Sequence, residues 1–459
     1  MPHILDDIVY VAEGDGKRVG LALKDRRFHQ YVVGRTGVGK STLLENMIIQ
    51  DIRAGRGLAV IDPHGDLIQS IIAHIPESRI RDVIYVNPAD PDYAIGFNVF
   101  RAGQRMSHAR VVSQIISIFK KHWGESWGPR LEHVLRNSLL TLVEHPESTL
   151  LWLPKLLSDE HFRNKQIKRL KDPIVKSFWQ HEFASYSERF RAEVLAPLQN
   201  KVGAFSTNPF IRTIVGQSRS KLNMRDVMDR EKILLIRIPK GEIGEDATNL
   251  LGAFFLSAIE LAALSRADIP EPERKDFFLY IDEFQNFATE SFASILSEAR
   301  KYRLSLILAH QYLAQVDEKT RDAVFGNVGT MILFRVGVDD ARILEREVHI
   351  DATDSYNARG FDANFLINLS PFEVVYKRMV GGKIELPQSA MSLAPARHPD
   401  KNFAAEIEAF TRKQYARRRV EVEAEIERFF AVVKHSDHHQ KEKPRHVGGA
   451  KVAAFPNHS

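Results

Sequence analysis

A glycine-rich stretch near the start of the chain has the residue types and spacing of a phosphate-binding loop. The segment YVVGRTGVGKST (31–42) fits G-x-x-x-x-G-K-S, and it lies between a strand-like QYVV and a helical STLLENMIIQDIRA, the context that such a loop requires. Its backbone N–H groups would wrap phosphates, Lys40 would reach the β- and γ-phosphates, and the Ser41 hydroxyl would bind Mg²⁺. We therefore expect ATP and Mg²⁺ to bind a continuous set of residues: Gly34, Arg35, Thr36, Gly37, Val38, Gly39, Lys40, Ser41 and Thr42.

Two consecutive carboxylates follow another apolar run. DFFLYIDEF (276–284) places Asp282 and Glu283 at the C-terminal end of a predicted buried strand, where α/β sheets bind ligands. Asp282 would orient the Mg²⁺ and its waters, and Glu283 could polarise the attacking water as a general base. The alternative is a helix-capping aspartate beside a solvent-exposed glutamate. The pair favours ATP hydrolysis, because GTPases and small-molecule kinases usually lack the second carboxylate.

A further apolar run, LSLILAHQ (304–311), is preceded by basic residues and ends in a polar one. Gln311 at its end could contact the γ-phosphate and report hydrolysis, or it could be an ordinary surface glutamine. Arg300, Lys301 and Arg303 precede the run. A solvated surface is their default interpretation, and the functional one is an arginine inserted into the site of a neighbouring subunit.

The pattern of apolar runs predicts an α/β fold. Seven short β-rich runs alternate with helical patterns, which favours a mostly parallel sheet, and EGDGK (13–17) is typical of a hairpin turn. Between about 105 and 200 apolar residues recur at helical spacing, and all four tryptophans lie there. We expect an α/β core over 1–100 and 201–400, with an all-helical insertion over 101–200. A charged C-terminal helix over 401–434 and a flexible tail over 435–459 are expected to follow.

Composition bounds the possible partners and compartments. Sixty-four Lys and Arg against 59 Asp and Glu give a formal charge of +5, which permits a polyanionic partner without requiring one. The absence of cysteine excludes disulfides and thiolate zinc sites. The N-terminus does not resemble a secretory signal, and the apolar run Leu250–Ser265 is interrupted by Glu260 and is shorter than the ~20 residues that span a bilayer. We expect a cytoplasmic protein without a membrane span of its own.

Three segments are candidates for contact with DNA, two of them basic. HFRNKQIKRLKDPIVK (161–176) could neutralise backbone phosphates, or it could be a solvated face of the helical insertion. TRKQYARRR (411–419) suggests an intrahelical charge network or a subunit contact, and KGEIGED (240–246) is a candidate channel loop. Three histidines of the tail could bind metal, although a flexible polar tail is the preferred interpretation: His435, His438 and His439.

Taken in order, these motifs resemble the HerA/FtsK superfamily of ring-forming DNA translocases, and more narrowly the type IV coupling-protein ATPases of conjugative DNA transfer. The resemblance extends over roughly 30–387 and includes further segments beyond the loop, the Asp-Glu-Phe strand and the strand ending in AHQ. These are GLAVIDPHGDLI (57–68), LQNKVGAFSTNPFIRTIVGQ (198–217), KGEIGEDATNLLGAFFLSAIELAALSR (240–266) and GNVGTMILFRVGVDDARILERE (326–347).

The resemblance implies a RecA-like P-loop motor with an all-helical insertion. It implies a homohexamer with nucleotide at subunit interfaces and DNA in a central channel. Arg300, 11 positions before Gln311 (311 − 300), fits the interface arginine best, with Arg303 and Arg335 as the other candidates. Membrane-anchored coupling proteins carry transmembrane helices before the loop, whereas about 33 residues precede it here, so the anchor is expected to be a separate chain or the protein a soluble relative.

The function expected from these features is ATP-driven movement of DNA, with a relaxase, a nuclease or a membrane secretion channel as partner. One alternative is a soluble HerA-like translocase in DNA processing or defence. Another is a nucleotide-switched adaptor whose helical insertion recruits a protein substrate. A transporter ATPase is disfavoured because the sequence has no LSGGQ-like helix start.

Overall fold

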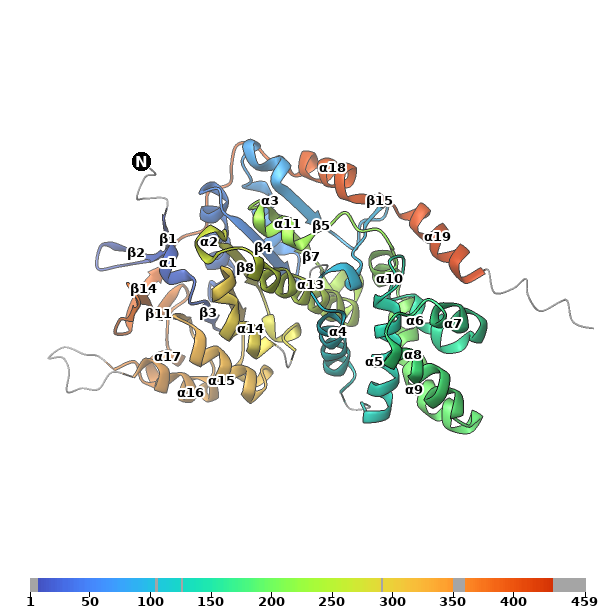
Figure 1. The fold of residues 1–459 in the computed structure, drawn as a ribbon. Coiled ribbons are helices and arrows are strands. Elements are labelled where there is room, and N and C mark those ends of the chain that lie inside the picture. The colour runs from blue at the N-terminus through green and yellow to red at the C-terminus, as the bar shows by residue number, and fades with distance from the viewer. Residues whose placement is uncertain (1–6, 104–105, 125–126, 290–291, 350–359, 432–459) are drawn as a thin grey trace, which may run out of the picture.

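The protein is built around an eleven-stranded sheet (Figure 1). Its strands run in the order β2-β1-β14-β11-β10-β3-β9-β8-β4-β7-β5. The computed structural model describes the following residues: 7–103, 106–124, 127–289, 292–349 and 360–431. The predicted tail lies outside them, together with His435, His438 and His439.

Seven adjacent strands are parallel, which confirms the α/β fold that the apolar runs predicted. All of their residues are buried except Tyr85, which is half-buried, because helices cover both faces of this part of the sheet. Parallel strands end at one common edge, so the segments that follow them lie near one another. The seven are β3 (Gln30–Val33), β4 (Gly57–Asp62), β5 (Val83–Val86), β7 (Ile233–Arg237), β8 (Phe277–Ile281), β9 (Leu304–His310) and β10 (Thr330–Leu333).

Four antiparallel strands extend the sheet beyond β10. The first hairpin turns at Asp15 and Gly16, both with positive φ, as EGDGK predicted. The other two strands, which join this hairpin to the parallel part, were not predicted from the sequence. The four are β1 (Ile8–Gly14), β2 (Lys17–Ala22), β11 (Glu373–Lys377) and β14 (Gln388–Ser392); a separate small hairpin pairs β12 (Met379–Val380) with β13 (Lys383–Ile384).

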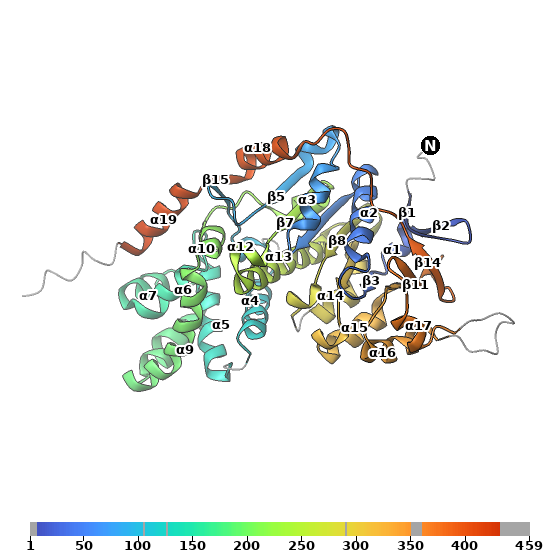
Figure 2. The same cartoon turned by 180° about the vertical axis from the view of Figure 1, so that it is seen from behind.

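Helices cover the two faces of the parallel strands (Figures 1 and 2). Side chains alternate between the faces, so that Leu58 and Val60 pack with one layer and Ala59 and Ile61 with the other. The first layer contains α2 (Lys40–Arg53), α3 (Asp66–Ala73) and α18 (Ala404–Tyr415), and the second contains α13 (Glu245–Ser265), α4 (His108–His122) and α14 (Phe292–Glu298). Shorter or peripheral helices are α1 (Leu23–Arg26), α12 (Lys240–Ile243), α15 (Glu318–Asn327), α16 (Val338–Val348) and α17 (Ala363–Ile367).

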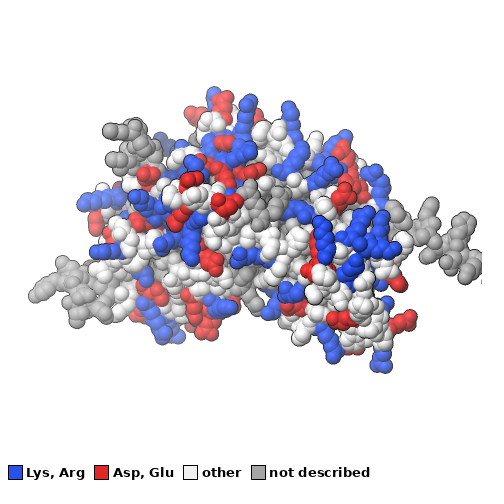
Figure 3. Space-filling view, viewed as in Figure 1, with Lys and Arg blue, Asp and Glu red and all other residues white. Residues whose placement is uncertain are grey.

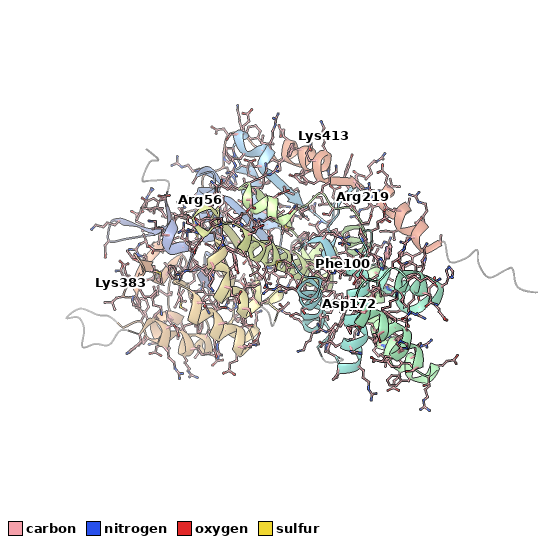
Figure 4. The ribbon with its side chains drawn as sticks, in the orientation of Figure 1. Arg56, Phe100, Asp172, Arg219, Lys383 and Lys413 are labelled. Carbon is pink, nitrogen blue, oxygen red and sulfur yellow. The ribbon has the colours of Figure 1, made fainter. Side chains whose placement is uncertain are left out.

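An all-helical segment lies between β6 (Tyr93–Ile95) and β7, as predicted. Side chains that accept hydrogen bonds from first-turn N–H groups begin several of its helices, among them Ser107, Asp159 and Asn208. Figure 4 places Asp172 among these helices and Lys383 on the opposite side of the molecule. After α4 the helices are α5 (Pro129–Val143), α6 (Trp152–Ser158), α7 (Glu160–Ile167), α8 (Pro173–Ser177), the π-helix η5 (Phe178–Phe183), α9 (Glu188–Thr207), α10 (Pro209–Val215) and α11 (Met224–Asp229). Because α9 continues past residue 200, the helical segment extends beyond the boundary expected there.

One charged helix was predicted over 401–434. The described part of this segment, up to residue 431, forms two helices instead. The helices α18 and α19 (Arg419–Ala431) are separated by β15 (Ala416–Arg418), which pairs antiparallel with β6. This pairing satisfies backbone groups that would otherwise continue the helix, so a tertiary contact overrides helix propensity.

The basic residues of that segment make contacts within the chain. Arg412 pairs with Asp90 at 2.9 Å and Arg417 with Glu425 at 2.8 Å. At its far end α19 reaches the helical segment, where the Phe429 ring stacks on Trp152 with centroids 5.4 Å apart. The C-terminal segment therefore connects the sheet to the helical segment.

A buried ion cluster fixes α2 against β8. Arg26 donates two hydrogen bonds to Asp51 on α2, at 2.7 and 2.8 Å, and Tyr280 on β8 donates a third at 2.6 Å. Arg56, which Figure 4 labels, adds a fourth at 2.8 Å. The Arg26 guanidinium also lies 4.0 Å from the centre of the Phe278 ring. Each buried charge in this cluster is paired, which is the condition for tolerating it in the interior.

The long helix α13 is a core helix. Among the described residues one helical stretch, Glu245–Asp268, is long and apolar enough to cross a membrane, with mean hydropathy 1.6, and 94% of its 18-residue apolar window is buried within the fold. Its Glu260 is only 6% exposed. Burial raises the pKa of Glu260 to about 8, against opposing contributions from Gln114 and Arg110.

This pKa predicts how Glu260→Gln should change stability with pH. The raised pKa of Glu260 contributes stability that is fully present below the pKa of the unfolded chain, near 4.5. This contribution is lost as the pH rises through the folded pKa of about 8. Glutamine stays neutral, so the variant's free energy of unfolding relative to wild type should increase from pH 5 to pH 9, by at most about 1.4 kcal/mol per pH unit. Urea unfolding at pH 5, 7 and 9 measures this, with the exposed Glu273→Gln as control. An equal difference at all three pH values would contradict the prediction.

Candidate active site

The loop between β3 and α2 has the conformation that its glycines suggest. Gly37 and Gly39 have φ angles of 78° and 117°, which other residues rarely adopt. A Cβ on Gly34 would lie 2.5 Å from the Cβ of Phe334, so the neighbouring strand end leaves no room for a side chain. The loop follows the buried strand β3, and α2 begins at Lys40.

Lys40 occupies the centre of the loop. Its ammonium group donates hydrogen bonds to the carbonyl oxygens of Gly34 and Arg35, at 2.6 and 3.0 Å. Burial lowers its pKa, and Glu283 and Asp282 oppose that shift. No side chain caps α2, so the N–H groups of its first turn can serve a bound anion. Ser41 is exposed and Thr42 half-buried at this helix start.

Asp282 and Glu283 directly follow β8 and are 6% and 5% exposed. Asp282 accepts a hydrogen bond from the Glu283 N–H at 3.1 Å. Burial, followed by the charges of Glu283 and Asp62, raises the pKa of Asp282 to about 7, and Lys40 opposes this shift. Glu283 has φ 50°, in the left-handed region, and strain of this kind is concentrated at functional sites.

Gln311 joins the loop to the carboxylates. Its side-chain nitrogen donates to Oε1 of Glu283 at 2.6 Å, and its oxygen accepts from the Thr36 hydroxyl at 2.8 Å. The structure therefore places Gln311 between two predicted parts of the site and not at an unrelated surface.

The three candidate arginines have different environments. Arg300 is exposed on the 3-10 helix η9 (Ala299–Tyr302), with its guanidinium 3.9 Å from the centre of the Phe28 ring. Since η9 precedes β9 and Gln311 follows it, Arg300 lies at the opposite edge of the sheet, about 20 Å away along the strand. Arg303 pairs with Asp276 at 3.7 Å, and the carbonyl of Arg335 accepts a hydrogen bond from the Arg35 N–H beside the loop.

Two residues that border the site were not predicted from the sequence. Asp62, fully buried at the end of β4, accepts hydrogen bonds from the N–H groups of His64, Gly65 and Ile68. The sequence contains a signal for Asp62, because this residue ends an apolar run just as Asp282 does. Phe372 left no such signal; its N–H donates to the Val38 carbonyl across more than 300 residues of chain.

The oxygen donors present suit magnesium. The part of the chain that the structure describes holds no group of three or more His, Cys, Asp or Glu that could bind a metal ion. Mg²⁺ with nucleotide usually takes one or two carboxylates, a hydroxyl, waters and phosphate oxygens, so it does not need such a group. The Ser41 hydroxyl and the Asp282 carboxylate remain the predicted protein ligands.

The loop geometry predicts different results for alanine at its two left-handed glycines. Gly39→Ala should lower the free energy of unfolding more than Gly37→Ala, because its Cβ would lie 2.7 Å from the Phe372 ring, whereas nothing lies within 4 Å of a Cβ at Gly37. Gly37→Ala should show only the left-handed strain of about 1–2 kcal/mol. Chemical unfolding without nucleotide tests both variants. Equal losses would show that the Phe372 contact has no energetic effect.

Comparison with known proteins shows the family of the chain. Residues 18–344 match the family described as the type IV secretion-system coupling protein DNA-binding domain. The type 4 coupling protein DotL of Legionella pneumophila is 21% identical over 367 residues, 67% of this chain and 46% of that protein. The chain thus spans about half the length of that relative.

Solved structures show the same fold. The bacterial conjugative coupling protein TrwB in its unbound form has a TM-score of 0.61 at 16% identity, covering 86% of this chain and 92% of that one. TrwB in complex with ADP and Mg²⁺ also scores 0.61 at 16% identity, over 86% and 91%. VirB4 of Thermoanaerobacter pseudethanolicus scores 0.57 at 12% identity, over 84% and 96%. With the family match covering most of the chain, the protein belongs to the type IV secretion-system coupling protein family that shares this DNA-binding domain.

Proposed function

We propose that the protein is an ATP-hydrolysing motor that moves DNA in conjugative or type IV secretion-like transfer. The observation that carries the proposal is the hydrogen-bonded path from Thr36 through Gln311 to Glu283. It joins a phosphate-binding loop to a carboxylate suited to activating water. Family membership and the TrwB structure with ADP and Mg²⁺ support the choice of nucleotide and metal.

The residues of the site have distinct roles in this proposal. Lys40 leaves the two loop carbonyls and binds the β- and γ-phosphates, while the loop N–H groups wrap the phosphate oxygens. Magnesium, held by Ser41 and Asp282, would neutralise phosphate charge. Glu283 accepts a proton from the attacking water. Gln311 already contacts both the loop and Glu283, so loss of the γ-phosphate would change its partners.

Arg300 is assigned to the site of a neighbouring copy. It is exposed and lies at the sheet edge opposite its own loop, so it can serve only a second chain. An arginine supplied in trans stabilises charge on the transferred phosphoryl group. A ring of copies, with a hexamer as the expected size, would give every loop such an arginine.

The helical segment offers a surface for DNA phosphates. Figure 3 shows Lys and Arg side chains gathered over α7. Arg163 is buried and donates to the carbonyls of Leu156 and Leu157, so it is structural. The exposed basic residues of the segment are Lys165, Lys168, Arg169 and Lys171. They suit salt-sensitive, sequence-independent binding.

The candidate channel loop, 240–246, is mostly helical in the structure. It forms α12 and the start of α13 at the end of β7, the same edge of the sheet as the nucleotide loop. Lys240 pairs with Glu245 at 3.6 Å. A channel-facing role for this segment remains a proposal, as do a cytoplasmic location and a relaxase, nuclease or secretion channel as partner.

Phosphate release from ATP, measured with and without single- or double-stranded DNA, tests the function. DNA should stimulate the wild-type rate, and the stimulation should fall as salt is raised. Lys40→Ala should lose nucleotide binding. Glu283→Gln should retain nucleotide affinity and lose turnover by about 10²–10⁴-fold, since it removes the general base.

The control for Glu283→Gln is Glu427→Gln, which removes an exposed carboxylate of α19. Full hydrolysis by Glu283→Gln would remove the role assigned to this residue. An ATPase indifferent to DNA would favour the adaptor alternative, and a protein that leaves ATP uncleaved under every condition would end the motor proposal.

Mixing variants tests whether Arg300 acts in trans. Arg300→Ala and Glu283→Gln should each be nearly inactive alone, because a trans arginine contributes about 10³–10⁵-fold to turnover. Mixed oligomers should regain ATPase activity, since some interfaces then combine a wild-type Glu283 with a wild-type Arg300 from the next copy. Arg303→Ala serves as the control. An active Arg300→Ala protein, or no recovery at any mixing ratio, would refute the assignment.

A further inference from the structure

A lysine from the helical segment holds the turn that follows Glu283. Lys121 lies in the last turn of α4, and its ammonium group donates hydrogen bonds to the backbone carbonyls of Gln285, at 2.7 Å, and Ala288. Both acceptors belong to the turn after β8, which begins with the 3-10 helix η8 (Phe284–Asn286). In Figure 1, α4 lies beside the core helix α13, on the side of the remaining helices of the segment.

The same turn controls the direction of the Glu283 side chain. The Gln285 side-chain nitrogen donates to Oε2 of Glu283 at 2.7 Å, opposite the bond that Gln311 makes to Oε1. A continuous path therefore runs from Lys121 through the Gln285 backbone and side chain to the carboxylate. Because Glu283 is held in the left-handed region, the position of its carboxylate depends on the backbone on both sides of it.

The turn is anchored from two directions. From the core, Phe284 and Phe287 are 1% and 0% exposed, and the Phe284 ring meets those of Tyr31 and His310 edge-on. From the helical segment, Lys121 supplies charge-assisted bonds to two carbonyls. Phe284 and Phe287 hold the turn against the core, and Lys121 links the backbone of the turn to the helical segment.

The end of α4 has space around it. An open pocket of about 240 Å³ lies between it and the start of α13, with Lys121, His122, Asp246 and Asn286 among the lining residues. The two helices meet at one side of this pocket, where Nε2 of His122 lies 4.0 Å from Oδ1 of Asp246. A shift of the end of α4 would act on the turn through Lys121.

We infer that Lys121 is a positioning residue that couples the helical segment to Glu283. The inference rests on the proposed hydrolytic role of Glu283 and adds a partner from outside the nucleotide-binding core. Displacement of the helical segment by whatever it carries would reorient the general base, so that turnover responds to load. Lys121 contacts the backbone of the turn, so its effect on Glu283 is indirect.

Two measurements on wild type and Lys121→Met test the coupling. In the nucleotide-free protein, amide hydrogen exchange over 283–289 should be about fivefold faster in the variant, the effect of losing roughly one hydrogen bond. The variant's kcat should fall about 10- to 100-fold, as expected for a displaced catalytic group. Its affinity for a non-hydrolysable ATP analogue should not change, because the loop is untouched.

Two further variants separate positioning from a general loss of structure. Lys121→Arg keeps the charge and donors and should restore most of kcat, and Lys120→Met, one residue earlier on α4, should leave both readouts near wild type. An unchanged kcat in Lys121→Met overturns the inference, and so does a loss of analogue affinity accompanied by faster exchange throughout the chain. If the wild type hydrolyses no ATP, the proposed function fails, whereas the exchange measurement still shows whether Lys121 holds the turn.

Discussion

The hydrogen-bonded register of β3, β9 and β8 holds the three parts of the site together. Val33 pairs with His310 and Ile281 with Leu308, so the loop, Gln311 and Asp282 emerge side by side from one edge of the sheet. These strands are buried on both faces, and a slip of one residue would exchange the two sets of side chains between layers. Packing on both faces thus protects a geometry in which Thr36, Gln311 and Glu283 lie within hydrogen-bonding distance.

Electrostatics adds a second constraint on the same region. At the end of α2 that is far from the loop, the charges of Arg26 and Asp51 compensate each other, and removing one partner from such a pair costs about 3–5 kcal/mol. At the loop itself the charge balance is different. Asp282 and Glu283 lie near Lys40, and burial, followed by the charges of Glu283 and Asp62, raises the pKa of Asp282. The Arg26–Asp51 pair stabilises the fold, whereas the carboxylates near the loop favour the binding of a cation together with its nucleotide.

Features encoded over short stretches were predictable from the sequence, and features formed by distant contacts were not. Buried parallel strands, the loop and the Asp282–Glu283 pair each depend on fewer than about twelve consecutive residues. The break at 416–418 depends on pairing with 93–95, and no local pattern announces it. Lys121 likewise looks like an ordinary end-of-helix lysine until the fold brings it to Gln285, 164 residues away in the chain. The helical segment also continues past the expected boundary at 200, since α9 extends to Thr207.

The placement of Arg300 determines what kind of assembly the proposed chemistry requires. The loop lies at the edge where the parallel strands end, and Arg300 at the edge where they begin, so two copies that complete a site must meet through different surfaces. Such a heterologous contact cannot stop at a symmetric dimer; it either closes into a ring or continues as a filament. Ring closure gives every loop an arginine, and it also places each helical segment in the same relation to its own turn through Lys121. In that arrangement the state of one nucleotide can reach the next copy through Arg300, while the load on a copy reaches its own general base through α4.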